Sequence, residues 1–164
     1  MTSRVRIGFS TCRSCLISRL IRWVTQSQVS HTWLLLKEGP LSVPVVLEAV
    51  MGQGFRLVPF RVFETGNTIV ATIDPVVPIE DGVREALDWL GESYDLRGMF
   101  GEAVVMLGRR LHRRWHNPFF SSHTMFCSEA VVRTLQSAHY PGTSTLNAVS
   151  TSPQDLLDFL LGQM

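Results

Sequence analysis

The sequence has few cysteines, little net charge and no long apolar run, and each shortage excludes a class of protein. No apolar run approaches the about 20 residues that a membrane-spanning helix needs. Three cysteines are too few for a disulfide framework, and their odd number favours free thiols. A net charge of +1 provides no general attraction to nucleic acid or to anionic lipid.

The first part of the chain also lacks an uninterrupted apolar segment, because arginines occur throughout it. They are Arg4, Arg6, Arg13, Arg19 and Arg22. We therefore expect no signal peptide, and the cytoplasm is the default compartment. Export without a cleaved signal remains an alternative, which would fit a phage-encoded or injected effector.

The composition is that of a folded protein. Hydrophobic residues make up 45% of the 164 residues and charged residues 18%, which is typical of a globular chain. This length suits one domain with a substantial core, and we find no internal repeat, low-complexity segment or linker. The prediction is a single domain over residues 1–164.

The apolar pattern changes along the chain from strand-like to helix-like. It predicts a first strand over 5–9, a helix over 16–24, and strands over 29–36, 43–49, 55–58 and 68–73. Helices are predicted from 83 to 90, in a stretch ending near 111, from 127 to 138, and from Pro153 to 161. This order predicts an α+β fold with an antiparallel sheet packed against helices.

Cys127 begins the predicted helix over 127–138 and shares its apolar face. A cysteine at a helix start is exposed to the positive end of the helix dipole, which favours the nucleophilic thiolate. The alternative is a small buried cysteine that packs like alanine. Cys127 is therefore a candidate nucleophile that needs a base and a group to orient the base.

His31 and Glu48 are candidates for these two roles. They lie near the open end of a possible hairpin formed by the strands over 29–36 and 43–49. The imidazole would hold the thiol proton, and the carboxylate would fix its tautomer and stabilise its positive charge. Alternatively, Glu48 is only a strand-end charge. His123, four residues before Cys127, is a weaker candidate for the base.

Five segments in order give the sequence a specific resemblance. They are 20–27, Ser30-His31, Val46-Leu47-Glu48-Ala49, Tyr94-Asp95-Leu96-Arg97-Gly98 and Phe126-Cys127-Ser128-Glu129. The series resembles the circularly permuted NlpC/P60 (papain-like) superfamily. The likeness is closest to YiiX/YebB-like cysteine hydrolases, which are related to lecithin retinol acyltransferase.

This resemblance implies a papain-like fold with permuted topology and a Cys-His-Glu triad that forms an acyl-thioester. Cys127 would be the nucleophile, His31 the base and Glu48 its orienting partner. The backbone N–H of Cys127 would stabilise the oxyanion, and Tyr94 would line the site or donate to it. The implied substrate is a peptide, a peptidoglycan stem peptide or a lipid acyl group, with no cofactor or metal.

Two other functions need to be considered. A non-catalytic module could use the same fold to bind a lipid or peptide. Cys12 and Cys15 form a C-x-x-C between a strand and a helix, as in thiol-disulfide proteins. Regular βαβ alternation is missing, however, and the sequence has no second C-x-x-C to complete a zinc site.

A basic run, from Arg109 to Arg114, is followed by aromatic residues. It could contact an anionic lipid surface, or it could simply be a solvated helix end. His112 and His116 are four residues apart, but no acidic or cysteine ligand has matching spacing, so we favour a solvated face over a metal site. Glu129 lies on another face of the helix from Cys127 and is expected to be structural.

Overall fold

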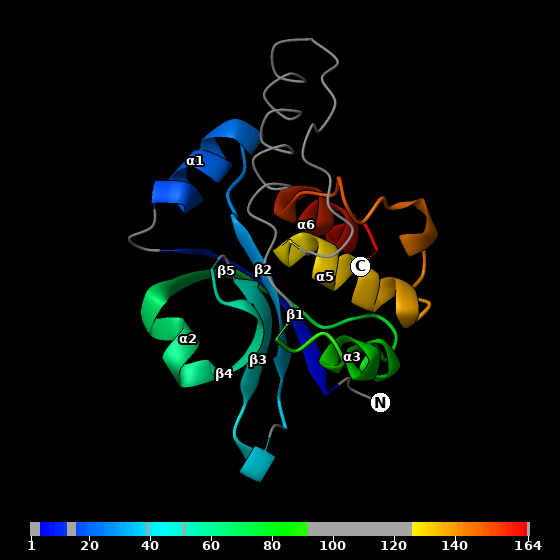
Figure 1. Cartoon of the computed structure of the whole chain (residues 1–164). Helices are drawn as coiled ribbons and strands as arrows, with labels where there is room; N and C mark the ends of the chain where they lie inside the picture. Colours follow the sequence, from blue (N-terminus) through cyan, green and yellow to red (C-terminus); the bar gives the residue numbers. More distant parts are fainter. Residues whose placement is uncertain (1–3, 13–15, 39, 51, 92–125, 164) are drawn as a thin grey trace.

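The structure is a computed structural model of the chain. It describes residues 4–12, 16–38, 40–50, 52–91 and 126–163 (Figure 1). In chain order the elements are β1 (Val5–Cys12), α1 (Leu16–Thr25), β2 (His31–Leu36), β3 (Val45–Val50), β4 (Gly54–Pro59), α2 (Phe60–Gly66), β5 (Asn67–Ile73), α3 (Glu80–Leu87), α5 (Cys127–Ser137) and α6 (Pro153–Leu161). Short 3-10 turns at Pro40–Ser42 and Thr143–Thr145 complete the described elements.

The strands form one antiparallel sheet in the order β4-β3-β2-β1-β5. β2 lies at its centre between β1 and β3. Leu34 of β2 faces Leu47 of β3, so these two strands form the hairpin that the sequence predicts. The α+β class with an antiparallel sheet is therefore confirmed.

Helices cover both faces of the sheet, as Figure 1 shows. One face carries the main core, where Leu34 and Leu47 of the sheet pack with Val131 and Leu135 of α5, together with side chains of α3 and α6. The other face carries a smaller cluster under α2, built on Trp33, Val46 and Phe63. Alternate residues of β2 therefore enter different layers, as the two-residue repeat of a strand requires.

Most predicted elements are present, with ends shifted by a few residues. The helix predicted over 83–90 begins earlier and ends earlier, at Glu80–Leu87. Sequence analysis missed α2 entirely, because a seven-residue helix with one fully buried side chain is too short to give a clear periodic signal. The predicted helical stretch ending near residue 111 lies outside the described residues.

Two N-terminal helix signals are confirmed. Ser152 caps α6 through its hydroxyl, which accepts from the Asp155 N–H at 3.1 Å, and Pro153 occupies the first turn. The helix predicted to begin at Cys127 does begin there.

Among the described helices, none is long and apolar enough to cross a membrane.

Candidate active site

His31 is the first residue of β2, so its side chain lies at the rim of the sheet. The backbone there is held by β1, where Ser10 faces His31 and the Ser30 N–H donates to the Ser10 carbonyl at 3.1 Å. The imidazole lies 6.2 Å, centroid to centroid, from the Phe63 ring of α2. Its side chain is 17% exposed. The ring is therefore supported by α2 but still reachable from solvent.

Glu48 of β3 holds one nitrogen of this ring. Its Oε2 lies 2.7 Å from His31 Nε2, and its side chain is only 2% exposed. The other oxygen, Oε1, accepts from Arg56 Nε at 3.1 Å and from Arg56 Nη2 at 2.7 Å. Both carboxylate oxygens are thus occupied, which fixes the carboxylate plane against the imidazole.

Cys127 is the first residue of α5, which packs against β2 and β3. The residue is 7% exposed, and its thiol hydrogen-bonds to His31. Because Nε2 of the ring is held by Glu48, Nδ1 is the nitrogen that remains for the sulfur. Backbone groups of Thr32 and Ser128 also hydrogen-bond to the thiol. The sulfur therefore lies among donors at the positive end of a helix.

The ionisation of the two partners is coupled. Burial alone would raise the pKa of the Cys127 thiol, but the hydrogen bond and positive charge of His31, with the backbone groups of Thr32 and Ser128, lower it below its ordinary 9.0. Burial alone would lower the pKa of His31, but hydrogen bonds to Cys127 and Glu48 and their negative charges raise it from 6.5 to about 10. Each partner therefore favours the charged form of the other, which is the condition for a thiolate–imidazolium pair.

The first turn of α5 is fixed by a second buried carboxylate. Glu129 Oε2 accepts from the Phe126 N–H at 3.4 Å, and Oε1 accepts from Arg133 at 3.0 and 2.7 Å. Glu129 thus caps the helix immediately before the cysteine and holds the backbone that carries the sulfur, which agrees with its expected structural role.

On its inner side Cys127 is closely packed. The space between α5 and the sheet there is too narrow for a water molecule, and its apolar lining is Leu34, Leu47, Ala49, Phe55, Ala130 and Val131. A molecule that reaches the sulfur therefore has to approach it from outside the core.

The structure brings together three of the four residues predicted for the site, namely Cys127, His31 and Glu48. The fourth, Tyr94, lies outside the described residues, as do Cys15, His112, His116, His123 and the run Arg109 to Arg114. Cys12 has a free thiol at the end of β1. His139 is exposed beyond the far end of α5.

Sequence analysis missed two residues that complete the site, Arg56 and Phe63. Arg56 had a readable signal, because Glu48 and Arg56 lie four residues on either side of Gly52 and face each other across the hairpin of β3 and β4. Phe63 had none, because α2 was not predicted.

A scan against protein-family models matches no family, and a search of curated proteins finds no match to this chain.

Proposed function

We propose that the protein is a cysteine hydrolase or acyltransferase of the permuted papain-like kind, with Cys127 as nucleophile, His31 as base and Glu48 as the orienting group. The observation that carries the proposal is the position of the His31 ring, which lies 2.7 Å from a buried carboxylate and hydrogen-bonds to a thiol at a helix N-terminus. These are the parts that activation of a cysteine requires.

The reaction would proceed in two halves. The Cys127 thiolate attacks a carbonyl carbon, and the oxyanion forms near the backbone N–H groups at the start of α5. The intermediate collapses to an acyl-thioester as the bond to the leaving group breaks, and His31 gives its proton to that group. Water or another acceptor then attacks the thioester, transfers its proton to His31 and releases the thiolate.

The substrate class follows from this chemistry and from the sequence resemblance. An activated thiol of this kind acts on amides, esters and thioesters. A peptide, a peptidoglycan stem peptide or a lipid acyl group would each supply such a carbonyl. Tyr94 remains a predicted contributor to the substrate side of the site.

The test uses a reactive acyl donor, a p-nitrophenyl ester, because it reports on the nucleophile whatever the natural substrate is. In a Cys12→Ser, Cys15→Ser background, the protein should release p-nitrophenol in a burst and carry an acyl group on Cys127 by mass spectrometry. Cys127→Ala should abolish the adduct. His31→Ala should slow its formation by about 10²–10⁴-fold, the usual contribution of a general base.

His139→Ala is the matched control, because this histidine is exposed and lies away from the thiol. Its burst should equal that of the parent. If His31→Ala also retains the full burst, the imidazole does not activate the sulfur and the hydrolase proposal is wrong. A Cys127 that reacts no faster than a free cysteine would instead indicate a binding module on the same fold.

A further inference from the structure

We propose that Arg56 is a positioning residue of the site, whose charge balances buried Glu48 and thereby allows Cys127 to exist as a thiolate. This inference rests on the proposed function, and it adds a fourth member to the predicted triad. Arg56 reaches Glu48 from β4, one of the two edge strands of the described sheet.

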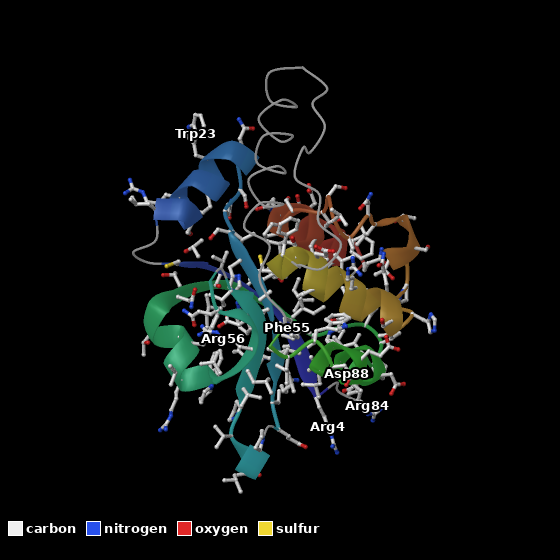
Figure 2. The ribbon with its side chains drawn as sticks, in the orientation of Figure 1. Arg4, Trp23, Phe55, Arg56, Arg84 and Asp88 are labelled. Atoms are coloured by element: carbon white, nitrogen blue, oxygen red, sulfur yellow. The ribbon has the colours of Figure 1, made fainter. Side chains whose placement is uncertain are left out.

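The contact is a fork that holds one oxygen of Glu48. Two nitrogens of the Arg56 guanidinium, Nε and Nη2, donate to Oε1 at 3.1 and 2.7 Å, and the third, Nη1, donates to Gln53. Figure 2 shows Arg56 beside Phe55, and the two neighbours on β4 have opposite roles, since Phe55 enters the main core. The guanidinium is thus anchored at each of its nitrogens.

Charge bookkeeping along the site gives the reason for this anchor. With the pair ionised, the charges run from the Cys127 thiolate to the His31 imidazolium, the Glu48 carboxylate and the Arg56 guanidinium. They alternate in sign and sum to zero. Without Arg56 the same buried group would carry a net negative charge, which a low-dielectric site disfavours. Proton uptake, by the thiolate or by Glu48, would relieve it, and either outcome weakens the ion pair.

Among the described residues, few other charged side chains lie near these four alternating charges. α2, which packs against β4, carries Arg61 and Glu64, and both are exposed. β2 and β3 contribute His31 and Glu48 themselves. Besides Cys127, α5 carries the buried Glu129, whose charge is balanced by its own partner Arg133 at 2.7 Å. Arg56 is thus the cation positioned to neutralise Glu48. Its own side chain is 37% exposed, so it is charged without a large desolvation penalty.

The experiment follows alkylation of Cys127 by iodoacetamide as a function of pH, in the Cys12→Ser, Cys15→Ser background. Arg56→Met should move the acidic limb of the rate profile up by about one pH unit, which slows the reaction about tenfold at pH values below that limb. Arg56→Lys, which keeps the charge but not the fork, should retain most of the parent profile. Arg56→Gln, which keeps a hydrogen-bond donor without charge, should behave like Arg56→Met.

The matched control is Arg6→Met. Arg6 also donates from Nε and Nη2 to one carboxylate, reaching Oδ1 and Oδ2 of Asp74 at 2.8 and 2.6 Å, on an exposed part of the sheet. Its profile should coincide with that of the parent. Circular dichroism confirms that each variant is folded, and Arg56→Lys and Arg56→Gln provide the comparison if Arg56→Met is not.

The outcomes separate this inference from the proposed function. If the parent Cys127 shows no enhanced reactivity at pH 6, the hydrolase proposal fails. If the parent is reactive and a folded Arg56→Met or Arg56→Gln has the same profile, only the role of Arg56 is overturned. A folded Arg56→Lys that is as impaired as Arg56→Gln would also contradict charge balance.

Discussion

The two ends of the central strands carry charge clusters of similar chemistry in opposite surroundings. At one end Glu48 lies between His31 and Arg56, with a side chain that is 2% exposed. At the other end Asp74 lies between Arg6 and Lys37, with a side chain that is 50% exposed. Hydrogen bonds from both partners hold the pKa of Asp74 well below its usual value.

The main difference between the ends is exposure to solvent, because each carboxylate hydrogen-bonds to two basic side chains. Water screens the Asp74 cluster, so its ion pairs contribute little to stability. Around Glu48, burial raises the free energy of any charge that has no partner. The pKa values of the neighbouring His31 and Cys127 are therefore shifted. A carboxylate between two basic side chains therefore gives a surface contact at one end and, in the function we propose, an activated thiol at the other.

The largest effect should come from removing the buried carboxylate. Glu48→Gln leaves Arg56 without a counter-ion and the imidazolium with only the Cys127 thiolate, and breaking a buried pair from one side costs about 3 kcal/mol of unfolding free energy. Urea unfolding at pH 7 measures this cost. The matched change Asp74→Asn should cost much less, and equal costs would contradict the comparison.

A smaller effect should follow from crowding the sheet beneath the site. A Cβ on Gly8 would lie 2.3 Å from the ring of Trp33, which is fully buried beneath Phe63 and thus supports His31. Gly8→Ala should therefore destabilise the protein by about 2 kcal/mol, a typical cost of overpacking.

Gly66 provides the control for this change, because a Cβ there would meet nothing within 4 Å. Thermal unfolding should show a lower midpoint for Gly8→Ala and a nearly unchanged one for Gly66→Ala. A Gly8→Ala variant as stable as the parent would mean that Trp33 has room to move and that the layer under α2 is loosely packed.

The smallest effect is expected at the exposed end. Asp74→Asn should cost less than about 1 kcal/mol at pH 7, because the cluster is screened by water and salt. The native pKa of Asp74 is lowered, so its contribution is present above the unfolded value and is lost as the pH falls through the lower native value. Unfolding of parent and variant should show a smaller difference in unfolding free energy at pH 3 than at pH 7. A difference that is as large at pH 3 as at pH 7 would show that the charge is not its source.

Much of this arrangement could be read from the sequence, and the reasons are local. The strand pattern around His31 and Glu48 is regular enough to predict a hairpin, and a hairpin brings these two residues together. The start of α5 at Cys127 follows from an apolar stripe with helical spacing. The association of Cys127 with His31 could only be inferred through the family resemblance, since the two are 96 positions apart.

What escaped prediction depends on contacts across the sheet. Arg56 gains its role from the register of β3 and β4, which places it opposite Glu48. Phe63 gains its role from α2, a helix too short for a periodic signal. The pairing of Arg56 could have been read from its symmetric spacing about Gly52, whereas the contact of Phe63 depends on tertiary packing that no local pattern specifies.

The ionisation of His31 is the most direct test of the account. In a histidine NMR titration, the His31 signal is assigned by its loss in His31→Asn. This imidazole should still be protonated well above pH 7, with a pKa of about 10. The same signal should titrate at distinctly lower pH in Cys127→Ala, which removes the thiolate. A His31 that titrates near 6.5 in both proteins would contradict the ion pair and, with it, the activated cysteine.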